Sequence, residues 1–218
     1  MTRILITSGP TRQYLDPVRY LTNASSGRMG AALAAAALDR EFEVEVVSGP
    51  VEIAYPHGAR VTRVVSTDEM LEACQNLFPS CGGMIGAAAP CDYRPHVVAQ
   101  QKIAKTGGGL TLELIETDDI VASLAAGKGT RWVVGFALET NDHRLRALAK
   151  LQRKHCDLMV SNSAEAINAV NNRVEILAPD GAVLRTAAGS KDHVAREIIA
   201  VIEQRLVLPR QSGSELVR

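Results

Sequence analysis

The sequence has no excess of charge of either sign. Lysine and arginine together number 24, and so do aspartate and glutamate. No overall field therefore draws the chain toward nucleic acid or an acidic membrane surface, and we expect neither as a partner. Any anion site has to be built locally.

Cysteine pairs and long apolar runs are also missing. The four cysteines form no Cys-x-x-Cys pair, and none has histidine or cysteine partners at the spacing of a zinc site. We interpret them as reduced, mainly structural thiols. The apolar run before Thr7, Ser8 and Gly9 is far shorter than a signal peptide's hydrophobic region or a membrane span. We therefore expect a cytoplasmic location.

The chain does contain short β-branched apolar runs that alternate with segments rich in alanine and leucine. This alternation is typical of βα units on a mostly parallel sheet. At 218 residues and 46% hydrophobic composition, the chain fits one core. We predict a single Rossmann-like α/β domain over residues 1–208 and a flexible tail over 209–218. Strands are predicted at residues 4–7, 43–47, 61–65, 83–88, 110–115, 132–138 and 157–161.

Capping patterns locate the helices. Ser66 and Glu69 form a capping-box signature ahead of an apolar face. Ser190 precedes a second apolar helix that is predicted to end at Leu206. An alanine-rich helix is predicted over residues 31–38.

A hairpin is predicted near the C-terminus. Residues 173–177 and 182–186 flank Pro179-Asp180-Gly181, which is a turn signal. We therefore expect an antiparallel extension of the sheet.

Two long connections interrupt the alternation. About eighteen residues, 8–25, separate the first strand from its helix, where a compact βα connection needs about two to six. A second connection runs from 92 to 109 and ends in three glycines. Because ligands of open α/β sheets bind at loops that follow strands, these are the candidate functional segments.

The first candidate site is the start of the alanine-rich helix. Unpaired amides at a helix start can cradle a phosphate, Gly27 would permit close approach, and Ser26 could cap the helix. An ordinary capped helix packed through its small residues is equally compatible with the sequence. The stretch comprises Asn23, Ser25, Ser26, Gly27 and Arg28.

Further candidates follow later strands. The small residues Gly86, Ala87 and Ala88 would let a ligand lie against the backbone, and Asp92 could accept from a ribose hydroxyl or a base amine. A turn capped by the aspartate is the simpler alternative. Phe136 could stack on a nucleobase or fill the core.

Two pairs of lysines could contact phosphate. Lys102 and Lys105 lie on the glycine-flanked loop, where a lysine could close over a triphosphate. Lys150 and Lys154 are one helical turn apart, as a two-point clamp requires. On spacing alone, solvated lysines are the commoner explanation of both pairs. Asn162 follows the last parallel strand, with no role assigned.

Together these stretches closely resemble phosphopantothenoylcysteine synthetase, in the CTP-using form of bacteria. Several long motifs in the same order over nearly the whole chain argue against chance. The matching segments are ITSGPTRQYLDPVRYLTNASSGRMG, VEVVSGPV, GAAAPCDYRP, QKIAK, TDDIVASL, VGFALET and KLQRKHCDLMVSN.

The resemblance implies a ligase of coenzyme A biosynthesis that joins 4′-phosphopantothenate to L-cysteine. The carboxylate would attack the α-phosphorus of CTP, release pyrophosphate and leave an acyl cytidylate, from which the cysteine amine would displace CMP. Magnesium would accompany the triphosphate, and no flavin or NAD is implied. The decarboxylase that often precedes this domain is expected on a separate chain.

A homodimer is also implied, in which an extension of one subunit completes the other's site. The hairpin near Pro179 could serve this association.

The resemblance also implies roles for individual residues. Asn23 would handle the acyl intermediate, and Lys102 would neutralise the triphosphate; these two are the implied catalytic residues. The implied contacts of the substrate phosphate are Ser25, Ser26, Gly27 and Arg28, and the implied nucleotide contacts are Gly86, Ala87, Ala88, Asp92, Lys102, Asp118, Asp119, Ile120, Val121, Phe136, Lys150 and Lys154.

The chain departs from the family pattern at four places. Arg28 replaces a common lysine and keeps its charge. Pro90-Cys91 replaces Val-Ala, and the proline removes a backbone donor beside the implied nucleotide pocket. Asp118 replaces a proline and would oppose a nearby phosphate. Leu138 replaces a smaller residue.

Two other functions are weighed against the ligase. An NAD(P)-dependent reductase would need a glycine fingerprint and an acidic ribose partner, but Ser25 and Ser48 stand at those positions. A noncatalytic nucleotide-binding module would bind CTP without turnover.

Overall fold

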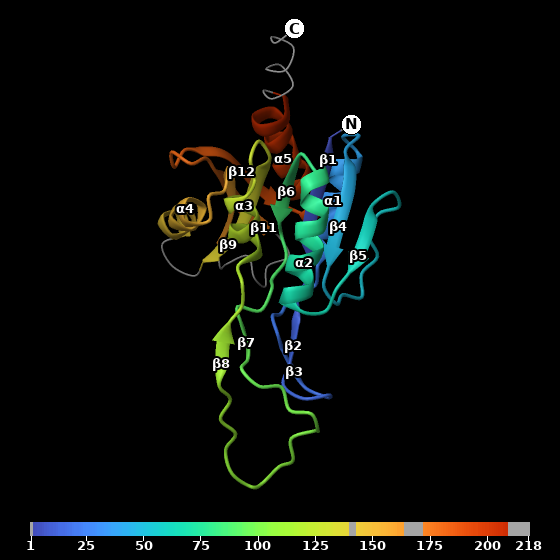
Figure 1. Cartoon of the computed structure of the whole chain (residues 1–218). Coiled ribbons are helices and arrows are strands. Elements are labelled where there is room, and N and C mark those ends of the chain that lie inside the picture. The colour runs from blue at the N-terminus through green and yellow to red at the C-terminus, as the bar shows by residue number, and fades with distance from the viewer. Residues whose placement is uncertain (1, 140–142, 164–171, 209–218) are drawn as a thin grey trace.

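The computed structural model describes residues 2–139, 143–163 and 172–208. They form a sheet covered by helices on both faces, with two short ribbons that project beyond one end of it (Figure 1). The predicted tail, residues 209–218, lies outside the described residues. The strands of the main sheet are β1 (Arg3–Ser8), β4 (Glu43–Ser48), β5 (Arg60–Arg63), β6 (Gly83–Gly86), β9 (Trp132–Glu139), β10 (Leu158–Ser163), β11 (Asn172–Leu177) and β12 (Val183–Gly189).

The strand order in this sheet is β12-β11-β10-β9-β6-β1-β4-β5. Neighbours from β10 to β5 pair in parallel, whereas β11 is antiparallel to both β10 and β12. The predicted Rossmann-like class and C-terminal hairpin are therefore confirmed. The order reverses between β1 and β6, and ligands of open α/β sheets bind outside the carboxyl ends of the strands at such a point.

Alternation along the central strands divides the interior into two cores. Ile4 and Ile6 of β1 belong to one core and Leu5 to the other, and all three are fully buried. Removing each such side chain from water is worth about 1.5–3 kcal/mol before entropy is counted. The first core is closed by α1 (Arg28–Leu38) and α5 (Lys191–Ile202), and the second by α2 (Thr67–Leu77), α3 (Ile120–Ala126) and α4 (His143–Arg153).

The predicted caps of α2 and α5 are confirmed. Glu69 N donates to Ser66 Oγ over 3.1 Å, and Val65 N donates to Glu69 Oε2 over 2.8 Å. His193 N donates to Ser190 Oγ over 3.2 Å. α5 continues into a π-helical segment, η3 (Glu203–Val207), so the apolar face extends to the predicted Leu206.

One predicted strand was placed wrongly. Residues 110–115 do not join the main sheet; β8 (Leu114–Glu116) pairs with β7 (Tyr93–Pro95) in a separate antiparallel ribbon. A second ribbon, β2 (Arg12–Tyr14) with β3 (Tyr20–Thr22), lies inside the long first connection and was not predicted. We call residues 12–22 and 93–116 the arm; it projects from the carboxyl end of the parallel strands (Figure 1).

Smaller differences concern strand ends. β6 stops at Gly86 instead of residue 88, because the backbone turns there and Ala87 N donates to Ile85 O over 3.2 Å. β5 ends at Arg63 instead of residue 65. Within the described residues, no helix combines the length and apolarity that crossing a membrane requires.

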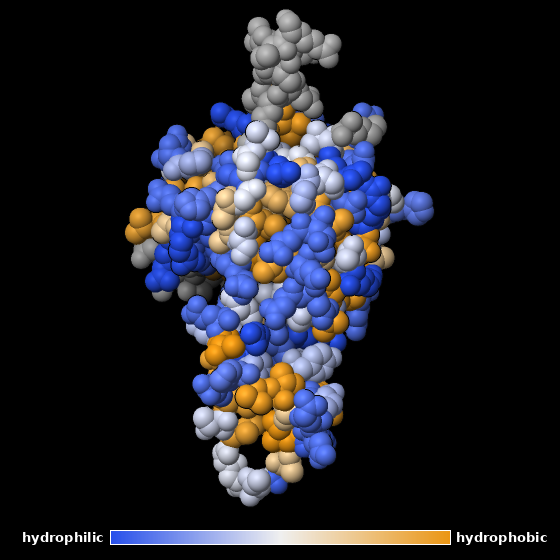
Figure 2. All heavy atoms as spheres, viewed as in Figure 1, coloured by the Kyte–Doolittle hydropathy of each residue, from blue (hydrophilic) through white to orange (hydrophobic). Residues whose placement is uncertain are grey.

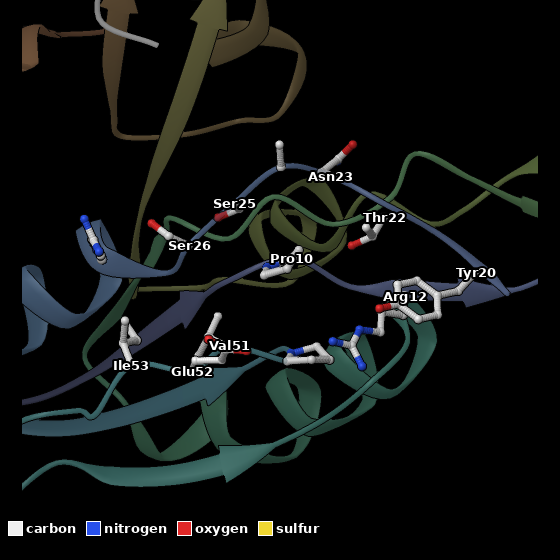
Figure 3. Close-up of a pocket in the computed structure, with 13 residues that line it drawn as sticks. Pro10, Arg12, Tyr20, Thr22, Asn23, Ser25, Ser26, Val51, Glu52 and Ile53 are labelled. Carbon is white, nitrogen blue, oxygen red and sulfur yellow. The ribbon is translucent and has the colours of Figure 1, made fainter. Parts of the chain in front are cut away.

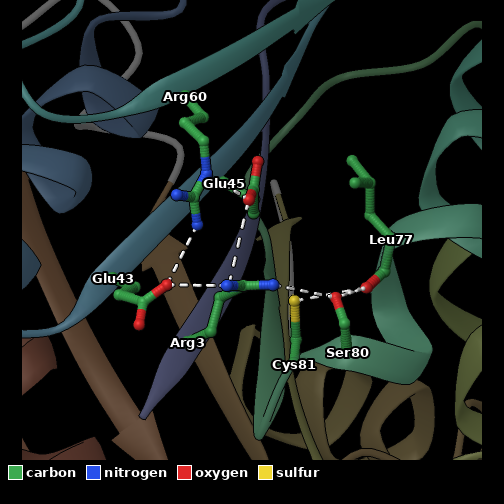
Figure 4. A network of polar contacts seen from close by, with 7 residues as sticks. All are labelled: Arg3, Glu43, Glu45, Arg60, Leu77, Ser80 and Cys81. Atoms are coloured by element: carbon green, nitrogen blue, oxygen red, sulfur yellow. Dashed lines mark hydrogen bonds and ion pairs between the residues drawn. The ribbon is translucent and has the colours of Figure 1, made fainter. Parts of the chain in front are cut away.

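An ion-pair network joins β1, β4 and β5 at the amino end of the sheet (Figure 4). Arg3 Nη2 donates to Glu43 Oε2 over 2.8 Å, and Arg60 Nη2 donates to the same oxygen over 3.0 Å. Arg60 Nε also donates to Glu45 Oε1 over 2.6 Å. Hydrogen bonds from Arg3 and Arg60 hold the pKa of Glu43 below its usual value of 4.5. Folding therefore favours the ionised carboxylate.

Glu43→Gln is expected to lower the free energy of unfolding at pH 7. The carboxylate's contribution is fully present above pH 4.5 and is lost as the pH falls through the lower pKa of the folded state. The difference from wild type should therefore shrink between pH 7 and pH 3, as urea unfolding at both pH values would measure. Glu72→Gln, which changes an exposed carboxylate on α2, is the control. A difference independent of pH would contradict the prediction.

Candidate functional site

The first of two pockets at the carboxyl edge of the sheet lies at the ends of β1 and β4 and has a volume of about 720 Å³ (Figure 3). We call it the serine pocket. One wall comes from the connection between β1 and α1, and the other from the loop after β4. The predicted residues Asn23, Ser25, Ser26 and Arg28 line it together with Arg12, Tyr20, Val51, Glu52 and Ile53.

The second pocket, of about 520 Å³, lies at the carboxyl ends of β6 and β9 and at the start of α3. We call it the aspartate pocket. Gly86 permits its shape, because a Cβ there would lie 2.5 Å from Val121 Cγ2. It brings together most of the predicted nucleotide contacts, namely Gly86, Ala88, Asp92, Asp118, Asp119, Ile120, Val121, Phe136 and Lys154.

Asn23 lies at the boundary between these pockets. Its side chain lines the serine pocket, while its Nδ2 donates to Pro90 O over 2.8 Å and to Ala89 O over 3.3 Å. Pro90 in turn lines the aspartate pocket. Because both partners are carbonyls, the amide orientation is fixed, and Oδ1 points away from them.

Three threonines, of which Thr11 and Thr67 are buried, hold the strip that separates the pockets. Cys91 N donates to Thr11 Oγ1 over 2.8 Å, and Cys91 O accepts from Thr117 Oγ1 over 2.6 Å and from Thr67 Oγ1 over 3.2 Å. Thr11 and Thr67 also bond each other over 2.9 Å. The wall is therefore fixed from three separate segments. These threonines form no sequence motif of their own, so their role was not predicted.

The start of α1 differs from the prediction that Ser26 caps it. Gly27 is the capping residue, with φ at 73°, and no side chain caps the helix. Its carbonyl accepts from Ser8 Oγ over 3.1 Å and from Ala31 N, so the three amides before Ala31 have no acceptor within the helix. Gly30 packs closely as well, since a Cβ there would lie 2.1 Å from Ser8 Oγ. The segment therefore both packs tightly through its glycines and leaves amides available for a phosphate, so the two interpretations of the sequence are compatible.

Comparison with known proteins fits this geometry. Residues 1–206 match the family described as DNA/pantothenate metabolism flavoprotein C-terminal domain. The chain belongs to this family.

Relatives in the family are bifunctional proteins. The chain is 41% identical over 203 residues to the coenzyme A biosynthesis bifunctional protein CoaBC of Vibrio parahaemolyticus, covering 90% of this chain and 51% of that protein. It is 43% identical over 186 residues to that of Escherichia coli K12, covering 82% and 46%. The chain thus spans about half the length of these relatives.

A solved structure of the family has the same fold. The crystal structure of the C-terminal domain of a CoaBC protein superposes with a TM-score of 0.80 at 36% identity. The match covers 94% of this chain and 95% of that one. The two pockets therefore lie on the fold of a coenzyme A biosynthesis protein's C-terminal domain.

The ammonium group of Lys154, predicted to bind phosphate, already forms an ion pair with a carboxylate. Its Nζ lies 2.9 Å from Asp119 Oδ2, and Asp119 Oδ1 accepts from Ala122 N as the cap of α3. Burial raises the pKa of Asp119, but the bonds from Lys154 and Ala122 and the charges of Lys154 and Arg153 outweigh it and lower the pKa. An incoming phosphate would compete with this carboxylate.

Other predicted residues lie outside the pocket linings. Lys150 is half-buried on α4, Ala87 packs against the first core, and Gly27 is buried under the serine pocket's wall. Lys102 is exposed on the arm and lines neither pocket. Phe136 lines the aspartate pocket, where it could meet a base, and it also packs against the first core.

The four cysteines are free, as predicted, and all four are buried. Burial raises the pKa of Cys74 to about 12 and that of Cys156 to about 11, and it raises the pKa of Cys91 in the wall. These are inert thiols. In the described part of the chain, histidines, cysteines and carboxylates form no group that could hold a metal.

Gly30→Ala is expected to lower the free energy of unfolding by roughly 1–3 kcal/mol. The new Cβ would lie 2.1 Å from Ser8 Oγ and 2.5 Å from Ser8 Cβ, so β1 or α1 must shift. Urea unfolding measures the effect. Gly108→Ala is the control, because a Cβ there meets nothing within 4 Å. Equal stability of Gly30→Ala and wild type would contradict the packing described here.

Proposed function

We propose that this chain is a phosphopantothenate–cysteine ligase, which joins 4′-phosphopantothenate to L-cysteine in coenzyme A biosynthesis through an acyl cytidylate made from CTP. The observation that carries the proposal is the position of Asn23 on the wall between two pockets. Membership of a family whose relatives are named for coenzyme A biosynthesis supports it.

The serine pocket suits the phosphorylated acid. The free amides at the start of α1 carry the positive end of the helix dipole, and Arg28 adds a full charge beside them. Val51 and Ile53 on the opposite wall offer apolar contact to the body of the substrate. We place the phosphate at residues 25–28 and the carboxylate near Asn23.

The aspartate pocket suits the nucleotide. Asp92 presents a carboxylate acceptor, and Phe136 offers a ring face for the base. Pro90 gives no backbone donor at the pocket wall. Lys154 follows α4 and reaches Asp119 at the start of α3, where it would partly offset the charge of the phosphates.

The acid in the serine pocket and the nucleotide in the aspartate pocket would meet at Asn23, where the pockets adjoin. A carboxylate oxygen of the acid attacks the α-phosphorus, and the bond to pyrophosphate breaks. The cysteine amine next attacks the acyl carbon, loses a proton, and the bond to CMP breaks. Asn23 can exchange its 3.3 Å bond to Ala89 O for one to the acyl carbonyl while keeping its 2.8 Å bond to Pro90 O. It would thus stabilise the oxygen as negative charge develops.

Magnesium is proposed to enter on the triphosphate. The carboxylates of the aspartate pocket that the structure describes form no group able to hold the metal by themselves. Magnesium commonly keeps several waters and binds through substrate phosphates, so this arrangement suffices.

We also propose a homodimer that associates through the arm. Large apolar side chains are exposed along both ribbons and appear as the lower patch in Figure 2. Val18, Val97 and Leu110 are 58%, 77% and 57% exposed. Since Lys102 lines neither pocket of its own subunit, we propose that it serves the partner's site. Association through the hairpin near Pro179, the decarboxylase on a separate chain and the cytoplasmic location stay predictions.

A reductase finds less support. Ser48, at the position of the acidic ribose partner, is fully buried and bonds Gly49 O and Tyr55 Oη over 2.8 Å each. Weak binding of NADPH in a fluorescence titration is the expected outcome.

The proposal is tested by incubating the protein with 4′-phosphopantothenate, L-cysteine, magnesium and either CTP or ATP. We expect pyrophosphate and the coupled product with CTP, and much less with ATP. Binding of CTP without pyrophosphate release would instead support a noncatalytic module. No binding and no turnover with either nucleotide would overturn the proposal.

Asn23→Asp is expected to slow amide formation by roughly 100-fold or more while pyrophosphate release stays largely intact. A carboxylate cannot donate to the acyl oxygen, and it repels the carbonyls of Ala89 and Pro90. Rapid quench of both half-reactions separates the two rates. Equal loss of both rates would refute this assignment of roles.

A further inference from the structure

A buried carboxylate lies at the turn of the β2–β3 ribbon. The side chain of Asp16 is fully buried, although the arm around it is largely exposed. Asp16 Oδ1 accepts from Val18 N and from Arg19 N, each over 2.8 Å. Asp16 Oδ2 accepts from Arg19 Nε over 3.0 Å and from Arg19 Nη2 over 2.5 Å.

The same pair reaches across to the long loop between β7 and β8. Ile103 N donates to Asp16 Oδ2 over 3.1 Å, and Arg19 Nη2 donates to Ile103 O over 2.6 Å. Both backbone groups of one loop residue are therefore bound by one ion pair. Nearby, Ala99 N donates to Leu15 O over 2.9 Å.

The charge of Asp16 is stabilised in the fold. Burial by itself raises the pKa of Asp16, but the bonds from Ile103, Val18 and Arg19 outweigh it and hold the pKa far below its usual range. The carboxylate thus stays ionised at neutral pH. Loss of Asp16 would remove the shared acceptor of Arg19 and of three backbone amides, whereas loss of Arg19 would leave the buried carboxylate with those amides but no countercharge.

The loop has two different halves on either side of this contact. Up to Ile103 it is tied to the β2–β3 ribbon. Among the described residues, no hydrogen bond joins 104–112 to another part of the arm, and a Cβ on Gly107, Gly108 or Gly109 would meet nothing within 4 Å. The loop closes again where His96 N donates to Glu113 O over 3.0 Å.

Lys102 directly precedes Ile103, the residue whose backbone the ion pair holds. We propose that Asp16 and Arg19 are positioning residues for Lys102: they hold the backbone of Ile103 so that the lysine is presented from a fixed point instead of a freely moving lid. This inference rests on the proposed role of Lys102 in the ligase. The pair would act on whichever copy of the site the lysine serves.

The alternative is that the pair only stabilises the arm. Residues that act through one another give non-additive effects, whereas a general structural loss adds to other variants. A double-mutant cycle between Asp16 and Lys102 therefore separates positioning from stability.

The cycle compares wild type, Asp16→Asn, Lys102→Ala and the double variant in the CTP assay. We expect Asp16→Asn to lower the rate of pyrophosphate release roughly 10- to 100-fold, as for a misplaced catalytic group, with little change in KM for phosphopantothenate. In the Lys102→Ala background the same change should alter the rate less than about 3-fold. Equal losses in both backgrounds would overturn the inference.

Two further variants provide a second test and a control. Arg19→Gln leaves Asp16 with its three backbone donors, and it should show the same dependence on Lys102 even if Asp16→Asn folds poorly. Asp68→Asn makes the same chemical change in an exposed pair with Arg94 at 3.9 Å, and it should leave the rate unchanged. A loss in Asp68→Asn equal to that in Asp16→Asn would count against positioning.

The outcomes also separate this inference from the proposed function. Absence of pyrophosphate release by wild type would refute the ligase. An active wild type with an unaffected Lys102→Ala would refute the role of the lysine, and with it the positioning. An impaired Lys102→Ala beside a fully active Asp16→Asn would refute the positioning alone.

Discussion

The site depends on one short strip of backbone, residues 89–91, held between two pockets. Asn23 binds it from one side, and Thr11, Thr67 and Thr117 bind it from the others. Ala89 N also donates to Gly9 O over 2.9 Å, which ties the strip to the end of β1. Because Asn23 lines the serine pocket and Pro90 lines the aspartate pocket, a movement of this strip would change both pockets together.

Charge is balanced over the whole protein but not within each pocket. Cations gather on the serine pocket's side, at Arg12 and Arg28, while acids predominate in the aspartate pocket. Lys154 already bonds Asp119 there. An anionic ligand in the aspartate pocket would therefore need to bring countercharge, and one in the serine pocket would not.

The sequence was enough to predict the sheet, its parallel centre and most helix starts, because buried strands and capped helices leave strong local patterns. It failed for the arm, since the leucine alternation over 110–115 predicts a strand but not the sheet that it joins. It failed for the cap of α1, because the bond from Ser8 Oγ to Gly27 O joins segments 19 residues apart and leaves no local pattern. The pairing of Lys154 with Asp119 joins distant segments and has no sequence signal.

The set of residues that line the aspartate pocket follows from the sheet topology more than from sequence motifs. Parallel strands bring their carboxyl ends to one edge, so residues after β6 and β9 and before α3 had to meet. Lys102 lies on the arm, which projects away from that edge (Figure 1), and it lines neither pocket.

The glycine triplet at the far half of the arm loop has a consequence for how this chain tolerates change. A segment whose ends are fixed at Ile103 and Glu113, and whose glycines touch no neighbour, can lengthen at little cost, since doubling a flexible loop costs only about 0.6 kcal/mol of closure entropy. Insertions should therefore be tolerated between these two anchors, while the contact of Asp16 with Ile103 fixes where the free half of the loop begins.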